Sequence, residues 1–291
     1  MTSQDTKELM EQVRHIEIRA RRMVDSRAAG AYHAMFKGQG IEFAEVREFH
    51  DGDDIRAIDW KVSARLGHPY VKLFTEEREQ NVFLLVDRSA SLDFGSRGTT
   101  KQRLAAEIAA VLALSAISNK DRVGLLLFTD REELHLRPAR GRRHVLRIVR
   151  ELLARETAST ATNLRGAIEH LLQAVKRKSI VFVVSDLLDE GFESPLRALS
   201  AKHEVKVLHI GDPLELALPN VPAMSVEDRE TGAVTVLRAS GVRSLSQRSA
   251  AWRAERASGC RRAGADYAWL ETGTDYLPAL LTLMEKKGAR R

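Results

Sequence analysis

Residues 81–91 read NVFLLVDRSAS, an apolar run followed by one aspartate and two serines. The run 82–86 is too short for most helices and is rich in β-branched and aromatic residues, so it predicts a strand buried on both faces of a sheet. In an open α/β sheet, the loop after a strand faces the ligand crevice. We therefore expect Asp87, Ser89 and Ser91 to project oxygen atoms into one small volume. Hard cations such as Mg²⁺ prefer oxygen ligands of this kind.

Two later segments carry further oxygen ligands. Thr162 lies just before a helical pattern, in TATNLRGAIEHLLQAV, and Asp186 ends a second apolar run, SIVFVVSD. If the strands that carry Asp87 and Asp186 are neighbours where the strand order reverses, both carboxylates and all three hydroxyls converge. Each residue also has a purely structural interpretation, because aspartates often form local turns after strands and serines are common in loops. The coincidence of three segments favours a metal site.

The metal-ion-dependent adhesion site of von Willebrand factor A domains has the pattern DxSxS, then a Thr, then an Asp. Five residues of this chain resemble that site and match it in the same order: Asp87, Ser89, Ser91, Thr162 and Asp186. The resemblance implies that Mg²⁺ or Mn²⁺ binds, with Asp87 as the directly bound carboxylate and Asp186 acting mostly through water. One departure is that Ala161 precedes Thr162, where that family has glycines. Asp93 and Asp189 fit no ligand position, and we interpret them as solvated loop acids.

A longer stretch before the first motif carries a second resemblance. Residues 38–79 read GQGIEFAEVREFHDGDDIRAIDWKVSARLGHPYVKLFTEERE and run straight into VFLLVDRSAS. This string closely resembles the bacterial family of unknown function numbered fifty-eight, and the similarity extends to DPLELALP at residues 212–219. Many members have Met where this chain has Leu92. Members are similar to von Willebrand A proteins and are typically paired with MoxR-type AAA+ ATPases. The resemblance implies a protein-binding module that partners such an ATPase in remodelling, maturation or metal insertion of client proteins.

Beyond residue 81, short apolar runs alternate with helical patterns. Strands are expected at residues 82–86, 122–128, 134–136, 180–184, 205–210 and 267–270. Helices are expected at residues 101–118, 142–154, 164–176, 195–201, 242–262 and 276–286. The alternation predicts an α/β fold with a doubly wound, mostly parallel sheet flanked by helices, as in von Willebrand factor A domains. Residues 223–238 interrupt it and predict a β-hairpin insertion closed near Thr231 and Gly232.

The first 80 residues predict a smaller unit packed on the main domain, residues 81–291. A helical pattern covers residues 7–26, and two or three short strands are expected around the DGDD turn at residues 51–54. Charges of both signs alternate through this segment at Arg47, Asp53, Arg56 and Asp59. We interpret them as a network that satisfies the backbone and one another, with Trp60 buried as an anchor. The alternative is a face that binds a partner.

The composition is that of a soluble globular protein. Of 291 residues, 44% are hydrophobic and 30% charged, proportions that suffice for a sizeable core. The N-terminus is polar and acidic, unlike a signal peptide, and the apolar stretch 105–117 contains Glu107 and is too short to span a bilayer. We therefore expect a cytoplasmic protein. The single cysteine, Cys260, has no partner for a disulfide or a metal site, and we assign it no role.

A net charge of +6 raises the possibility of nucleic-acid binding. The basic residues are densest at residues 137–151 and 243–262. These stretches resemble the outer faces of amphipathic helices in which Val145, Ile148 and Leu152, or Val242 and Leu245, point inward. No aromatic stacking platform accompanies them. Solvated helix faces are the preferred interpretation, and a nucleic-acid binder through these helices remains the third candidate.

The rival from another class is an enzyme, a magnesium-dependent phosphohydrolase with Asp87 as nucleophile. Such phosphotransferases usually place a second carboxylate two residues further on as acid or base, whereas Ser89 stands there in this chain. No G-x-S-x-G motif surrounds Ser89 or Ser91, and no Walker motif G-x-x-x-x-G-K-[ST] is present. The sequence therefore favours a binding module that has no catalytic residue of its own and recognises acidic side chains of other proteins.

Overall fold

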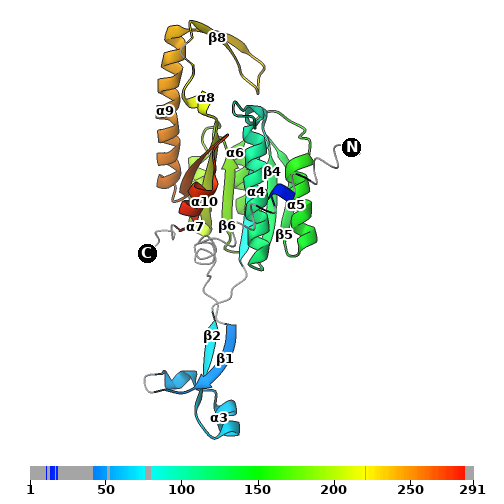
Figure 1. Cartoon of the computed structure of the whole chain (residues 1–291), viewed down its shortest axis with the longest axis vertical. Coiled ribbons are helices and arrows are strands. Elements are labelled where there is room, and N and C mark those ends of the chain that lie inside the picture. The colour runs from blue at the N-terminus through cyan, green and yellow to red at the C-terminus, as the bar shows by residue number, and fades with distance from the viewer. Residues whose placement is uncertain are drawn as a thin grey trace.

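The computed structural model describes residue 11, residues 14–16, residue 18, and residues 42–50, 53–75, 80–219 and 221–285. Its largest element is a six-stranded sheet with helices on both faces (Figure 1). The strands are β3 (Asn81–Asp87), β4 (Arg122–Phe128), β5 (Glu132–Ala139), β6 (Ile180–Ser185), β7 (Glu204–Gly211) and β10 (Asp266–Glu271). Their order is β10-β7-β6-β3-β4-β5, and all neighbouring pairs are parallel except β4 and β5. The predicted doubly wound, mostly parallel α/β fold is confirmed.

The strand order reverses between β3 and β6. From β3 the chain continues outward to β4 and β5, and it then returns to build β6, β7 and β10 on the other side of β3. β3 and β6 pair in parallel from Val82 with Ile180 to Val86 with Val184. The loops that follow these two strands therefore begin side by side, at the place where such sheets bind ligands.

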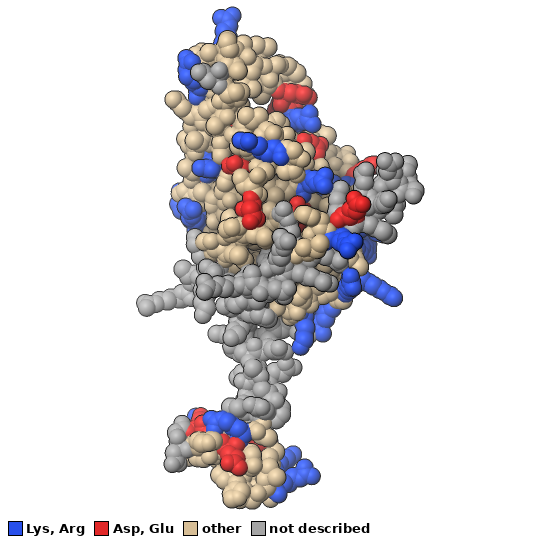
Figure 2. Space-filling model, viewed as in Figure 1, with Lys and Arg blue, Asp and Glu red and all other residues tan. Residues whose placement is uncertain are grey.

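Helices cover the two faces of the sheet in separate layers. The first layer comprises α4 (Lys101–Ser118), α5 (Arg142–Ala154) and α10 (Leu277–Glu285). The second comprises α6 (Leu164–Ala174), α7 (Glu193–Lys202) and the end of α9 (Ala239–Arg262). The basic helix α5 buries Val145, Ile148 and Leu152 as predicted. Lys and Arg are scattered among Asp and Glu on the face of the molecule seen in Figure 2 and form no continuous patch there.

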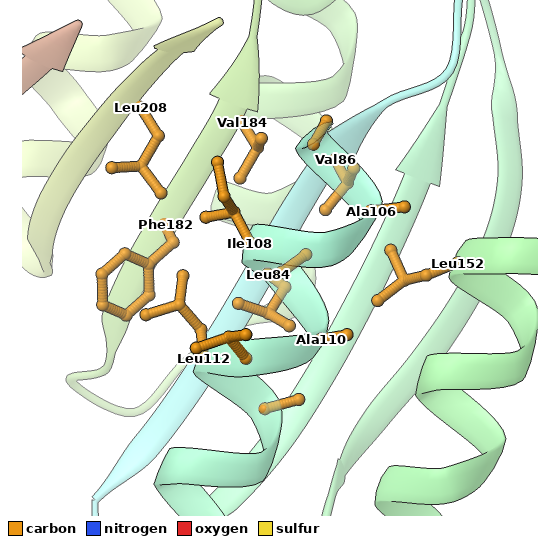
Figure 3. Close-up of a cluster of buried hydrophobic side chains, with 14 of the residues drawn as sticks. Leu84, Val86, Ala106, Ile108, Ala110, Leu112, Leu152, Phe182, Val184 and Leu208 are labelled. Atoms are coloured by element: carbon orange, nitrogen blue, oxygen red, sulfur yellow. The ribbon is translucent and has the colours of Figure 1, made fainter. Parts of the chain in front are cut away.

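The central strand β3 is buried on both faces, as its apolar run predicts. Leu84 and Val86 belong to the cluster beneath α4, whereas Phe83 and Leu85 belong to the cluster beneath α6. Figure 3 shows Leu84 and Val86 among side chains of α4 and β6, including Ile108. Burial of each such side chain contributes about 1.5–3 kcal/mol. The position of the loop after β3 is therefore fixed by packing on both sides.

The predicted hairpin insertion is present as β8 (Ala223–Glu227) and β9 (Val234–Arg238), which pair antiparallel. Its turn is built around Asp228, whose carboxylate accepts hydrogen bonds from the amides of Glu230 (2.9 Å) and Thr231 (3.1 Å). Gly232 has a φ of 72°, a backbone conformation that favours glycine. A short helix, α8 (Pro213–Leu216), was not predicted, although the Asp-Pro-Leu-Glu sequence forms a capping box at its start.

The N-terminal segment contains two strands, within the predicted two or three, together with a helix that was not predicted. It contains β1 (Glu42–Glu48), a 3-10 turn η1 (Ile55–Ala57), the helix α3 (Trp60–Leu66) and β2 (Tyr70–Thr75), which pairs with β1. Helix α3 forms because the carboxylate of Asp59 accepts hydrogen bonds from the amides of Lys61 and Val62, and Gly67 ends it with a φ of 76°.

The prediction that Trp60 is a buried anchor is wrong. As the first residue of α3 its side chain projects outward, and Trp60 is 68% exposed. The expected charge network is present in part, since Arg47 forms two hydrogen bonds of 2.7 Å with Asp53.

The predicted packing of this unit on the main domain involves residues 76–79, which lie outside the described residues, and it stays a prediction. The helix expected at residues 7–26 also lies mostly outside them, although residues 11, 14–16 and 18 are helical and Ile16 is buried in the cluster beneath α4. No helix in the part of the chain that the structure describes is long and apolar enough to cross a membrane.

Asp59→Ala should destabilise the N-terminal unit more than Trp60→Ala does. The order would be the reverse if the tryptophan were buried. Asp59→Ala removes an N-cap and should cost about 0.5–2 kcal/mol of stability in this unit. Trp60→Ala removes an exposed side chain and should change stability by no more than about 0.5 kcal/mol. Hydrogen exchange of the peptide 59–67 measures both effects. Greater deprotection by Trp60→Ala than by Asp59→Ala would contradict this assignment.

A buried carboxylate at the start of β4 makes the stability of the main domain depend on pH. Asp121 is 2% exposed and accepts one hydrogen bond of 2.9 Å from the amide of Gln80. Its second oxygen has no hydrogen-bond partner among the described residues. Burial raises the pKa of Asp121 to about 7.

Replacement of Asp121 by Asn should therefore flatten the pH profile of stability. The carboxyl pKa is about 3.9 in an unfolded chain, so the folded state takes up a proton between pH 4 and 7 and loses the associated stability as the pH rises through that window. Relative to Asp121→Asn, the unmodified protein should lose at most about 1.4 kcal/mol per pH unit there. Urea unfolding at several pH values tests this, and parallel profiles for the two proteins would exclude it.

Candidate metal centre

The loop after β3 holds the first three predicted ligands close together. The carboxylate of Asp87 accepts a hydrogen bond of 2.9 Å from the amide of Ser89. This turn starts the 3-10 segment η2 (Ala90–Asp93) and brings the hydroxyl oxygens of Ser89 and Ser91 to within 3.0 Å of each other. All three side chains are buried. The spacing of two residues therefore places three oxygen donors on one side of the turn.

The end of β6 supplies two more oxygen groups beside them. Ser185 donates a hydrogen bond of 2.7 Å from its hydroxyl to the second oxygen of Asp87. Asp186 follows it and is 2% exposed. Sequence reasoning missed Ser185, although a serine at the end of an otherwise apolar strand was a visible signal. The neighbouring ends of β3 and β6 bring Asp87 and Asp186 into one buried region, which the strand order required.

The charge of Asp87 is poorly compensated. Burial, and then the negative charge of Asp186, raise the pKa of Asp87 to about 7, while hydrogen bonds from Ser89 and Ser185 act in the opposite direction. No cationic side chain among the described residues forms an ion pair with Asp87. Such a carboxylate is stabilised in its charged form when a cation binds to it.

Lys101, at the start of α4, compensates the other carboxylate. Its ammonium nitrogen lies 2.9 Å from Asp186 and 2.6 Å from Glu215 of α8, and its side chain is 1% exposed. Burial lowers the pKa of Lys101, but the charges of Asp186 and Glu215 outweigh this effect and the net shift is upward. Sequence reasoning missed Lys101. A lysine in the first turn of a helix is unfavourable for the helix dipole, and this was the available signal.

The loop that carries Thr162 is joined by hydrogen bonds to the loops that follow β3 and β6. The amide of Ala90 donates a hydrogen bond of 2.9 Å to the carbonyl of Thr160. The carboxylate of Asp189 accepts a hydrogen bond of 2.7 Å from the amide of Leu164, at the start of α6. Asp189 is thus a structural residue that links two loops, which corrects its interpretation as a solvated acid. Asp93 is exposed, as expected.

The hydroxyl of Thr162 is engaged by the hairpin insertion. It donates a hydrogen bond of 2.7 Å to the carboxylate of Glu230, in the turn between β8 and β9. Both residues are half-buried. The sequence carried no signal for this contact, because residues 162 and 230 meet only in the folded chain. An acidic side chain of the protein itself therefore occupies the hydroxyl of one predicted ligand.

The residues present fit Mg²⁺ in their chemistry. They offer carboxylate and hydroxyl oxygens without sulfur or imidazole, which is the donor set that Mg²⁺ and Mn²⁺ prefer. The structure brings Asp87, Ser89 and Ser91 together through direct contacts. Asp186 lies beside them with its charge shared by Lys101, and Thr162 belongs to an adjoining loop with its hydroxyl on Glu230.

Two solved structures resemble this fold at low sequence identity. The conserved hypothetical protein BatB from Bacteroides thetaiotaomicron is 17% identical, with a TM-score of 0.47, over 70% of this chain and 97% of that one. The SpRpn10 VWA domain is 13% identical, with a TM-score of 0.39, over 73% of this chain and all of the other.

Curated relatives match at the level of sequence. The uncharacterized protein Rv1480 of Mycobacterium tuberculosis is 30% identical over 288 residues, which cover 97% of this chain and 91% of the relative. The uncharacterized protein YeaD of Bacillus subtilis is 46% identical over 48 residues, 16% of this chain and 12% of the relative. The family model described as "Protein of unknown function DUF58" matches residues 45–257. With the match spanning β1 to α9 and a relative aligned along nearly the whole chain, this protein belongs to the DUF58 family.

Proposed function

We propose that this chain is a metal-dependent protein-binding module. The observation that carries the proposal is Asp87, a fully buried carboxylate beside a second carboxylate, Asp186, with only hydrogen bonds to balance its charge. A site that held no cation would gain nothing from this arrangement, because two buried like charges repel. The hydroxyls of Ser89 and Ser91 lie where they add neutral oxygen donors.

When bound, Mg²⁺ or Mn²⁺ would supply positive charge and a coordination position open to an acidic side chain of another protein. Asp87, Ser89 and Ser91 would hold it, with Thr162 and Asp186 completing the set. Lys101 keeps the carboxylate of Asp186 in place. Opposite unit charges about 4 Å apart gain roughly 4 kcal/mol near a protein surface, which is enough to focus an otherwise modest interface.

The hairpin turn carries an acidic residue, Glu230, that would compete with an external carboxylate for this site. Glu230 holds the hydroxyl of Thr162, so an external carboxylate that approaches the same place must displace it. The Asp228 turn fixes the backbone of Glu230. We propose that Glu230 lowers the affinity for partners until they displace it.

The partner is proposed from the family resemblance to be a MoxR-type AAA+ ATPase. Together the two proteins would act in remodelling or maturation of client proteins, with this chain as adaptor. The phosphohydrolase alternative is weaker, because the second position after Asp87 is Ser89, whose hydroxyl contacts Ser91 and cannot replace a carboxylic acid as proton donor.

Neutralising Asp87 should abolish metal binding without unfolding the protein. Asp87→Asn keeps the shape of the side chain, removes its charge and relieves repulsion with Asp186. We expect calorimetry to show at least about a 100-fold loss of Mg²⁺ affinity, while the metal-free variant melts no lower than the unmodified protein. Asp93→Asn, an exposed acid of the same loop, is the matched control and should bind normally. Equal Mg²⁺ affinity in both variants would refute the metal site.

Removing Glu230 should strengthen binding of the partner. Glu230→Ala frees the hydroxyl of Thr162 and should raise the affinity for a MoxR-type ATPase from the same genome about tenfold, equivalent to ~1.4 kcal/mol. Glu227→Ala, on the exposed strand β8, is the control and should have no effect.

Measuring the affinity for the ATPase also tests the proposed function. EDTA and Asp87→Asn should each abolish binding of the ATPase. Binding that persists in EDTA would show that this contact does not use the site, and an unchanged affinity in Glu230→Ala would remove Glu230 as competitor.

A further inference from the structure

A second cluster of potential metal ligands lies on the edge strand β5 and on α6. Glu132 and His135 are on β5, the edge strand, and His170 is on α6. One ligand atom from each of the three residues lies within 4.8 Å of those of the other two. None of them belongs to the centre at Asp87.

A bulge in β5 puts Glu132 and His135 on the same face of the sheet. Residues three apart in a regular strand point to opposite faces. Here the pairing with β4 shifts, so that Glu132 is opposite Phe128 and His135 is opposite Leu126. Phe128 and Leu126 both belong to the core beneath α6. Side chains of directly paired residues share a face, so both potential ligands face α6 and His170.

Two of the three separations between ligand atoms are those of a tetrahedral ion. The Nε2 atom of His170 lies 3.2 Å from the Nδ1 atom of His135 and 3.2 Å from a carboxylate oxygen of Glu132. Ligand atoms bound about 2.0–2.1 Å from Zn²⁺ in a tetrahedron lie about 3.3 Å from one another. The two imidazole rings meet at 77°, with centroids 5.3 Å apart, which lets their nitrogen atoms approach without stacking.

Hydrogen bonds among the three side chains would satisfy these three atoms only incompletely. A neutral His170 carries at most one proton on Nε2 and would have to share it between His135 and Glu132. Burial and the neighbouring positive charges lower the pKa of His135, although Glu132 opposes them. Imidazole binds metal ions in its neutral form.

A pocket beside the cluster leaves room for a further ligand. It has a volume of about 200 Å³ and is lined by Glu132 and His170 together with residues such as Phe128, Asp130 and Asn163. Two histidines and one glutamate with an open fourth position form a donor set that zinc uses in reactive sites.

We propose that Glu132, His135 and His170 bind Zn²⁺, with its fourth position open to the adjoining pocket. Imidazole nitrogen atoms favour zinc over Mg²⁺, so the two centres of this chain select different metals by their donor atoms.

Calorimetry of the full chain tests the site. After treatment with a chelator, the protein is titrated with Zn²⁺ in the presence of excess Mg²⁺, which occupies oxygen-only sites. We expect one zinc per chain, and a loss of about 100-fold or more in His135→Gln and in His170→Gln, because even loss of outer-shell contacts costs about 10–100-fold. His68→Gln, at an exposed position of the N-terminal unit, is the control and should bind zinc normally.

Two further measurements keep the outcome unambiguous. Visible absorption of Co²⁺ bound in place of zinc should show the bands of a tetrahedral site, and these should disappear in both histidine variants. Asp87→Asn should retain zinc, which separates this site from the proposed Mg²⁺ centre. Unchanged zinc affinity in both histidine variants, or zinc binding lost in Asp87→Asn and retained in them, would overturn the assignment.

Discussion

The parallel pairing of β3 with β6 is the constraint on which the site depends. It brings the ends of two fully buried strands together, and with them the carboxylates of Asp87 and Asp186. Packing on both faces holds these ends in place, so the two acids cannot move apart to relieve their repulsion. Burial, and then the charge of Asp186, raise the pKa of Asp87. Lys101 relieves only one of the two charges.

The surrounding polar contacts tie the loops of this end of the molecule to one another. Asp212, at the end of β7, accepts hydrogen bonds from the backbone and hydroxyl of Ser96 and from the hydroxyl of Thr272. Asp189 links the loop after β6 to the start of α6. Asp212 and Asp189 thus each accept hydrogen bonds from another loop, which couples the positions of loops far apart in sequence. The hairpin, whose turn carries Glu230, reaches the same region.

The second cluster, on β5 and α6, is positioned in a different way. Its residues are half-exposed, and their approach depends on a strand irregularity at an edge rather than on a buried parallel pair. Bulges re-aim side chains in this way, and they are frequent beside binding sites. The two proposed cation sites therefore differ in chemistry, with nitrogen donors at this edge and oxygen donors at the carboxyl ends of β3 and β6.

The sequence by itself determined the alternation of strands and helices, the double burial of β3 and the hairpin, because periodicity and turn residues are local properties. It also named the oxygen donors after β3 and β6, since polar residues that end apolar strands stand out. It failed at Trp60, which was expected to be buried, because the cap of Asp59 starts a helix whose first side chain is exposed. Only the tertiary structure decided the ion pair of Lys101, the reach of Glu230 to Thr162 and the meeting of His135 with His170. Each of these contacts joins residues more than 30 positions apart, and a single sequence holds no local signal for the separation of such residues in space.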